Sequence, residues 1–538
     1  AALSISNVFM KKTWLTLILI FVLAAGLRLV KITKYPLSLN WDEAAFAYNA
    51  YSVLQTGKDE YGEVLPLQFK SVGDYKNPMY IYLLVPVIKG GGLNELTTRI
   101  PPAVLGALTI PLLYIIAWTL FKNRLLATVS GVLLAISPWH LQFTRAGADV
   151  GVSSFFVVLG ICLFLRKKYL TGVASLIGSM YSYFADKMFA PIMILLLLLM
   201  RQSRKAVLSV AVAGLLLLPI LFASSSAGPK NKIFITTLLS YSQPDELVRK
   251  LRAEDGSVIY AVFHNPVVEY GYMIMDRYLN HFSPSFLFIK GLEDNRQRIL
   301  GMGMMYWSDS LLLLLSLPLI AVNIKKKNWQ FLIVWLLLSP MPAAITRDPV
   351  HARRAFNMIY PLIILISYGL IELLKQKMVV KMVFGGFLLW SVGLYFLSYY
   401  VFTPLVTYKG SAGWQYGYKQ LVEFVSPIKG QYAKIVIDTS YQGPYIFFLF
   451  YEKYPPLRYQ QQAKLVGVEG LALGEGVGYD NYSFRPIFWP ADRGNKKILY
   501  AGPPERISLQ DIDPKSAKLL KTLYFPDETE AFRVVETF

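Results

Sequence analysis

Apolar runs long enough to cross a lipid bilayer recur along most of this chain. A helix rises about 1.5 Å per residue, so roughly 20 apolar residues cross a hydrocarbon layer about 30 Å thick. The sequence contains about eleven runs near this length. They cover residues 14–30, 97–121, 125–143, 150–165, 169–185, 188–200, 206–223, 310–324, 329–345, 356–374 and 378–401. The pattern predicts an α-helical polytopic membrane protein of about eleven spans.

The distribution of charge predicts how the chain is oriented. The formal net charge is +20 and only 16% of the 538 residues are charged. The basic residues form short clusters between apolar runs, which argues against nucleic acid as a partner. With the N-terminus inside, every second loop is basic, as the positive-inside rule requires. These clusters lie at 11–12, 122–124, 166–168, 201–205, 325–327 and 375–377. We expect a multi-pass protein of the cytoplasmic membrane with its C-terminal region outside.

The tail differs in character from the rest of the chain. It has an amphipathic helical pattern near 415–425 and strand-like runs at 434–438, 445–451, 497–500 and 532–537. We predict a transmembrane domain, residues 1–401, with long outer loops at 31–96 and 224–309. A small extracytoplasmic α/β domain, residues 402–538, follows. The single cysteine, Cys162, lies in an apolar run and allows no intrachain disulfide.

Charged residues in the first outer loop are the first candidates for a functional site. Asp42 and Glu43 follow the first span, and Lys76 precedes an aromatic, apolar segment. Adjacent carboxylates at a membrane surface are costly to desolvate, which favours a functional role. The alternative for the acidic pair is a helix N-terminus, where negative charge is stabilised by the dipole. The alternative for Lys76 is a side chain that extends to the interface from the membrane.

Together these segments resemble the GT-C superfamily of membrane glycosyltransferases, and more closely glycosyltransferase family 39 and the aminoarabinose transferases. The resemblance covers roughly residues 14–401, and the order of its motifs is more specific than any single motif. The motifs are Trp41-Asp42-Glu43, Lys76-Asn77-Pro78, Arg99-Ile100-Pro101, Ser137-Pro138-Trp139-His140, Arg145 with Asp149, His281-Phe282-Ser283-Pro284 and His351-Ala352-Arg353-Arg354.

The resemblance implies roles for three carboxylates. Asp42 matches the acidic residue of the first loop that acts as catalytic base in the family, and Glu43 is a second candidate beside it. Asp149 matches a second acidic position near the fourth span, although an aspartate there can also cap a helix.

The resemblance also implies cations that bind the carrier phosphate. Lys76 matches the lysine of the family's Lys-Pro-Pro segment, which reads Lys76-Asn77-Pro78 here. Either Arg353 or Arg354 matches a basic group near the phosphate. A base near the acceptor proton and cations at the leaving phosphate are what sugar transfer from a polyprenyl phosphate needs.

The sequence therefore favours an inverting glycosyltransferase that uses a polyprenyl-phosphate sugar donor on the outer face of the membrane. Its partners would be this donor, membrane lipids and an acceptor that is a protein, a lipid or a glycan. We expect no obligatory cofactor. His140, His281 and His351 leave a divalent cation as an alternative, but their spacing matches no compact metal motif. A transporter or flippase of lipid-linked sugars is the alternative function, but the chain has no internal repeat of the kind transporters use. The third functional hypothesis is a structural membrane protein whose tail binds partner proteins.

Overall fold

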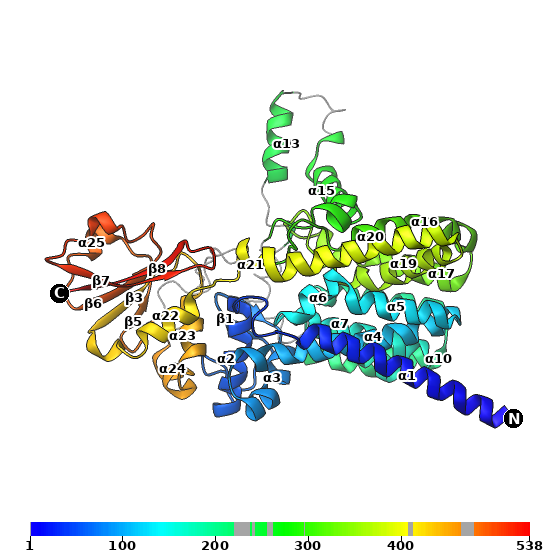
Figure 1. Ribbon diagram of the computed structural model, residues 1–538, viewed down its shortest axis with the longest axis horizontal. Helices are drawn as coiled ribbons and strands as arrows, with labels where there is room; N and C mark the ends of the chain where they lie inside the picture. The colour runs from blue at the N-terminus through cyan, green and yellow to red at the C-terminus, as the bar shows by residue number, and fades with distance from the viewer. Residues whose placement is uncertain are drawn as a thin grey trace.

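A bundle of helices and a mixed β-sheet lie at opposite ends of the protein, with the first outer loop between them (Figure 1). The computed structural model describes residues 2–219, 237–238, 243–254, 262–294, 296–406, 413–463 and 478–538. The bundle consists of α1 (Ala2–Leu29), α4 (Glu95–Phe121), α5 (Arg124–Ile136), α6 (Pro138–Arg145), α7 (Asp149–Leu165), α8 (Tyr169–Met180), α9 (Asp186–Arg201), α10 (Arg204–Gly214), α16 (Trp307–Asn323), α17 (Lys327–Leu338), α18 (Met341–Ala344), α19 (Ile359–Leu374) and α20 (Met378–Leu397).

Several helices of the bundle have the length and composition of membrane spans. Within the described residues these are 95–121, 356–374 and 378–406. The pair α5 and α6 makes a fourth if it counts as one span, bent by 54° where Pro138 begins α6. Four shorter apolar helices accompany them, at Thr13–Leu29, Asp149–Leu165, Tyr169–Met180 and Trp307–Asn323. These helices support the multi-pass character of the chain, and the figure of about eleven spans stays a prediction.

The two long loops that were predicted to lie outside, here called the first outer loop and the second long loop, contain secondary structure of their own. The first loop forms α2 (Trp41–Thr56), the hairpin of β1 (Phe69–Ser71) and β2 (Asp74–Lys76), and α3 (Pro78–Gly91). Val72 and Gly73 have positive φ angles of 51° and 66°. Two such residues in succession suit the tight turn of a two-residue hairpin, and they fix the register that places Lys76 opposite Phe69.

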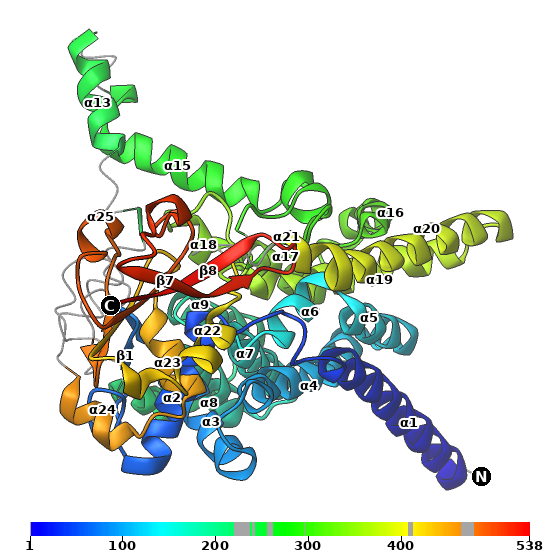
Figure 2. The same cartoon turned by 60° about the vertical axis from the view of Figure 1, so that its left-hand side comes forward.

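One part of the second long loop projects from the body, and another part packs against it. The loop contains α13 (Gln243–Glu254), α15 (Pro266–Asn280) and the short π-helical turn η3 (Ser285–Ile289). In Figure 2, α13 extends away from the rest of the structure, and α15 runs from it back towards α16. Helix α15 contacts α18, and η3 contacts α16.

The C-terminal region is built on a six-stranded sheet, which agrees with the predicted α/β character. The strand order is β4-β5-β3-β6-β8-β7, with β3 parallel to both β5 and β6. Its strands are β3 (Lys434–Ile437), β4 (Gly478–Tyr479), β5 (Tyr482–Phe484), β6 (Ile498–Gly502), β7 (Ala517–Tyr524) and β8 (Glu530–Thr537). Its helices include α22 (Tyr418–Val425), α23 (Pro444–Tyr451), α24 (Pro456–Gln462) and α25 (Trp489–Asp492).

One strand prediction in this region is wrong. Residues 445–451 were expected to form a strand and instead form most of helix α23. Pro444 stands at the start of this helix, where its missing N–H has no intrahelical partner to lose. Residues from Tyr445 to Phe450 are all buried, so the continuous apolar run reflects burial on every side of a helix.

The first outer loop and the C-terminal region share one hydrophobic core. Phe46 of α2 and Phe69 of β1 belong to the same buried cluster as Phe447 of α23 and Phe532 of β8. Helix α2 contacts both α23 and α24, which lie beside it in both views (Figures 1 and 2). The C-terminal region is therefore packed directly onto the loop that carries the acidic pair.

Candidate active site

Five of the six residues selected from the sequence line a single cavity. The cavity has a volume of about 1180 Å³, and its walls come from the start of α2, the β1–β2 hairpin, the start of α7, the segment after η3 and the segment before α19. The five are Asp42, Lys76, Asp149, Arg353 and Arg354, whereas Glu43 does not reach it. Segments more than 300 residues apart in sequence thus place their charged side chains around one space.

Asp42 and Lys76 form an ion pair at one side of this cavity. Asp42 lies in the first turn of α2, and the hairpin register brings the Lys76 Nζ to its carboxylate. The Lys76 Nζ also donates a hydrogen bond to the Asp74 Oδ2 at 3.2 Å. Lys76 is 7% exposed, so its ammonium is largely removed from water and depends on these two carboxylates.

Both partners stay charged despite their burial. Burial alone would raise the pKa of Asp42, but the positive charges of Lys76 and Arg353 outweigh it and lower that pKa below its ordinary value. Burial would likewise lower the pKa of Lys76, and the carboxylates of Asp42 and Asp74 raise it instead. The pair is therefore a carboxylate facing an ammonium at neutral pH.

Asp149 and Arg353 form a second ion pair in the same cavity. The Arg353 Nη2 donates to the Asp149 Oδ1 at 2.9 Å, and the same oxygen accepts from the Val150 N–H at 3.0 Å in the first turn of α7. Asp149 is the first residue of α7, whose N-cap is Ala148, and its carboxylate bonds both the next backbone N–H and the Arg353 cation. The catalytic role expected from the resemblance stays a prediction. Within the described part of the chain, the buried Nε of Arg353 has no hydrogen-bond partner. A half-buried guanidinium with an N–H donor that has no partner is suited to bind an anion.

The neighbouring Arg354 is held differently. Its Nη1 donates to the Thr346 Oγ1 at 2.7 Å and to the exposed Asp348 Oδ2 at 2.6 Å. Asp348 is 52% exposed, so solvent screens this pair more strongly than the pair of Arg353 with Asp149. The geometry separates two arginines that the sequence left equivalent, and it favours Arg353, whose Nε has no partner among the described residues, as the cation that binds an anion.

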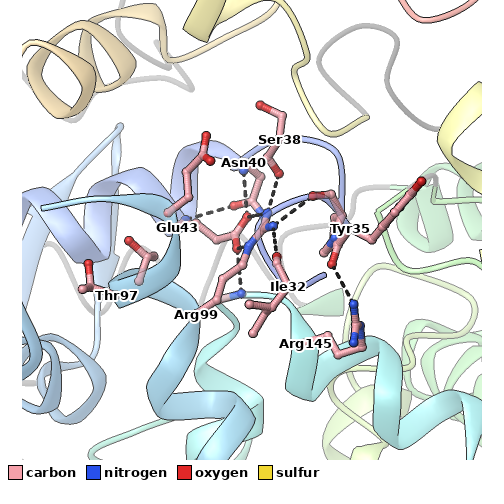
Figure 3. Close-up of polar contacts among 12 residues, drawn as sticks. Ile32, Tyr35, Ser38, Asn40, Glu43, Thr97, Arg99 and Arg145 are labelled. Carbon is pink, nitrogen blue, oxygen red and sulfur yellow. Dashed lines mark hydrogen bonds and ion pairs between the residues drawn. The ribbon is translucent and has the colours of Figure 1, made fainter. Parts of the chain in front are cut away.

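Glu43 does not line the cavity. Its carboxylate instead belongs to a buried network of polar contacts (Figure 3). Its Oε1 accepts hydrogen bonds from the Arg99 Nε at 2.8 Å and the Gly147 N–H at 2.7 Å. Its Oε2 accepts from the Asn40 N–H at 3.0 Å and completes a capping box at the start of α2. Fully buried and bonded in this way, Glu43 is better explained as a residue that fixes the start of α2 than as a catalytic acid or base.

Arg99 connects this network to the segment that joins α1 to α2. Its Nη1 donates to the carbonyl oxygens of Ile32 and Pro36 at 2.8 and 2.9 Å, and its Nη2 donates to that of Ser38 at 2.6 Å (Figure 3). The network therefore joins the starts of α2, α4 and α7, and so holds Asp42 and Asp149 relative to each other.

A cation from the second long loop was missed in the sequence. The guanidinium of Arg296 lies over the Trp41 ring, 4.7 Å from its centroid, and both residues line the cavity. Its charge contributes to the lowered pKa of Asp42. The run of charges at 293–298 could have identified it, but no spacing relates that run to Trp41.

The three histidines do not assemble a metal site. His140 is buried and contacts Arg28 and Thr109, while the His281 Nε2 accepts a hydrogen bond from the His351 N–H at 3.1 Å. No group of three or more His, Cys, Asp and Glu side chains suited to a metal ion occurs among the residues described. The divalent cation considered from the sequence stays a prediction, because these side chains do not by themselves make a site for it.

Comparison with known proteins supports the resemblance seen in the motifs. Residues 18–224 match the family described as dolichyl-phosphate-mannose-protein mannosyltransferase. No curated protein matches the chain in sequence at a significant level. The family match confirms the resemblance seen in the motifs for this part of the chain.

Solved structures similar to this protein include the Archaeoglobus fulgidus oligosaccharyltransferase tethered with an acceptor peptide. It has a TM-score of 0.50 at 11% identity and covers 97% of this chain and 74% of that one. The complex of that enzyme with Zn and sulfate has a TM-score of 0.49 at 13% identity and covers 81% of this chain and 61% of that one. This chain thus spans about three-fifths of the length of that enzyme. ArnT from Cupriavidus metallidurans bound to undecaprenyl phosphate has a TM-score of 0.47 at 11% identity, with 98% of each chain covered.

Proposed function

We propose that this membrane glycosyltransferase transfers a sugar, with inversion, from a polyprenyl-phosphate donor to an acceptor hydroxyl on the outer face of the cytoplasmic membrane. The observation that carries the proposal is the cavity in which Asp42, Lys76, Asp149 and Arg353 meet. It combines a carboxylate that can accept a proton with cations that can bind a phosphate. The family match to a dolichyl-phosphate-mannose-dependent transferase supports the class of donor.

In the proposed reaction the acceptor oxygen attacks the anomeric carbon of the sugar. The bond from that carbon to the phosphate oxygen breaks, and the phosphate leaves with the bonding electrons. The acceptor proton passes to the Asp42 carboxylate, while Lys76 and the free Nε of Arg353 stabilise the charge that grows on the phosphate. A single displacement of this kind inverts the anomeric configuration.

The low pKa of Asp42 bears on the timing of the proton transfer. As long as Lys76 donates to it, the carboxylate is a weak base. A phosphate that attracts the Lys76 ammonium would weaken this hydrogen bond and raise the proton affinity of Asp42. Donor binding and activation of the acceptor are thereby coupled through one lysine.

The charge of the loops supports the proposed orientation. A compact basic cluster lies in every second loop, as expected if the N-terminus is inside. The α2 start, the hairpin and the segments before α16 and α19 then lie on the outer side together with the C-terminal region.

Convergence of the charged residues also bears on the transporter alternative. A flippase would distribute its charges along a path near the bilayer midplane. Here the acidic and basic candidates gather at one cavity, an arrangement that supports a transferase instead.

The test is to incubate the purified protein with a panel of polyprenyl-phosphate sugars and candidate acceptors, and to follow release of the carrier phosphate. We expect release with at least one donor, and its loss in Asp42→Asn. Asp276→Asn is the matched control, because Asp276 lies on the exposed side of α15 and does not line the cavity. Turnover by Asp42→Asn at the rate of the wild type would overturn the role of Asp42. Absence of release with every donor would overturn the transferase itself.

A further inference from the structure

The C-terminal region reaches into the start of the helix that carries Asp42. The side chain of Gln415, which is 1% exposed, accepts a hydrogen bond from the Trp41 N–H at 2.9 Å through its Oε1. Its Nε2 donates to the carbonyl oxygens of Tyr441 and Gln442 at 2.6 and 2.8 Å. All the polar atoms of this side chain are thus used to tie the first residue of α2 to the C-terminal region.

This contact has a physical reason in the geometry of helices. The first N–H groups of an α-helix have no acceptor within the helix and need one from elsewhere. In α2 the Asn40 side chain accepts from the Glu43 N–H, and Gln415 accepts from the Trp41 N–H. The cap at the first turn is therefore completed from a segment 374 residues away in sequence.

A second contact holds the hairpin that carries Lys76. The Tyr445 hydroxyl accepts from the Val72 N–H at 2.8 Å in the hairpin turn and donates to the Glu60 Oε1 at 2.9 Å. Gly443, at φ 58°, approaches both segments. A Cβ there would lie 3.0 Å from the Val72 Cγ1 and 3.3 Å from the Trp41 Cβ. The same stretch of chain thus touches the hairpin turn and the start of α2.

We propose that the C-terminal region is a positioning element for the reaction, in which Gln415 sets the orientation of Asp42 and Tyr445 sets that of Lys76. The inference rests on the proposed function, because it assigns a purpose to the pair that this function uses. Without the Gln415 cap, the first turn of α2 loses an acceptor in a buried setting, and the Asp42 carboxylate beside it no longer has a fixed direction. Without the Tyr445 hydroxyl, the hairpin turn loses its anchor and Lys76 shifts at the other end of β2.

The two residues are expected to affect different kinetic constants. Gln415→Met keeps the length of the side chain and removes the hydrogen bonds, and a φ of 49° is similarly unfavourable for both residues. We expect it to lower kcat by about tenfold with little change in the donor KM, because Asp42 acts in the chemical step. Tyr445→Phe is expected to raise the donor KM severalfold, because Lys76 binds the phosphate in the ground state as well.

Gln460 provides a matched control. Its Nε2 also links the C-terminal region to α2, but near the other end of that helix, with bonds to Ser52 at 3.1 Å and Thr56 at 3.0 Å. Gln460→Met removes the same kind of contact from the same helix and should leave kcat and KM unchanged. If Gln415→Met and Gln460→Met give the same kcat and thermal stability, the contacts only stabilise the fold and the proposal is overturned.

Hydrogen exchange gives a readout that does not need turnover. Amides in the first turn of α2 should exchange faster in Gln415→Met than in the wild type, and those of the hairpin turn should do so in Tyr445→Phe. Unchanged exchange in both would overturn the positioning role even if the enzyme is active. If the wild type shows no transfer with any donor, the proposed function fails, while the exchange experiment still decides whether these segments are held from the C-terminal region.

Discussion

Replacing Arg353 by lysine tests which cation binds the carrier phosphate. Lysine keeps the positive charge and can still pair with Asp149, but it loses the buried Nε that has no partner among the described residues. A hydrogen bond to a charged group is worth about 1.5–3 kcal/mol. At about 1.4 kcal/mol per tenfold change, Arg353→Lys should weaken donor binding by roughly ten- to a hundredfold.

Arg354→Lys is the control for this experiment. The Arg354 guanidinium is bonded to Thr346 and to the exposed Asp348, and an exposed pair contributes about 0–1 kcal/mol. Its replacement should change donor affinity by less than about fivefold. The dissociation constant of a polyprenyl-phosphate sugar is measured by titration in detergent for the wild type and both variants. Wild-type affinity in Arg353→Lys would refute the reasoning, and a loss confined to Arg354→Lys would reverse the assignment.

Three further outcomes are expected. Asp42→Asn should reduce turnover at saturating donor on the order of a hundredfold or more, while donor binding survives. Near-normal turnover in this variant would make Asp149 the candidate for the catalytic base. Glu43→Gln should lower the free energy of unfolding by about 3 kcal/mol or more, because the buried Arg99 loses its countercharge. Thermal unfolding checks this, and an unchanged melting temperature would contradict it. Burial raises the pKa of Glu60 to about 8 from an ordinary 4.5, so its contribution to stability is full below pH 4.5 and is lost as the pH rises towards 8. In Glu60→Gln this slope should disappear from melting temperatures measured across that range, and a slope equal to that of the wild type would assign it to other groups.

The sequence identified five of the charged residues that line the cavity, including both partners of each of its two ion pairs, but could not assign their individual roles. Asp42 and Glu43 are adjacent, and successive residues on a helix differ by about 100° in direction, so one faces the cavity and the other the Arg99 network. Only the capping contacts between Asn40 and Glu43 determine which of the two carboxylates faces the cavity. The same holds for Arg353 and Arg354, whose partners come from α7 and from their own loop.

Contacts between distant segments could not be predicted from the sequence for a related reason. The pairing of Lys76 with Asp42 depends on a hairpin register, and that of Trp41 with Arg296 on a loop more than 250 residues away. Neither follows from local periodicity. Helix α23 was mistaken for a strand because a continuous apolar run has no period that separates the two. Long apolar runs with basic loops, by contrast, reflect the membrane itself and could be read directly.

The core shared by the first outer loop and the C-terminal region limits how this protein can be recombined. Phe46 and Phe69 pack in one cluster with Phe447 and Phe532, although the sequence suggests a boundary near residue 402. A chimera that takes only the C-terminal region from a relative would place foreign side chains against an unchanged loop, and close-packed interiors tolerate such mismatches poorly. A functional chimera should therefore take residues 31–96 and 402–538 from the same parent protein.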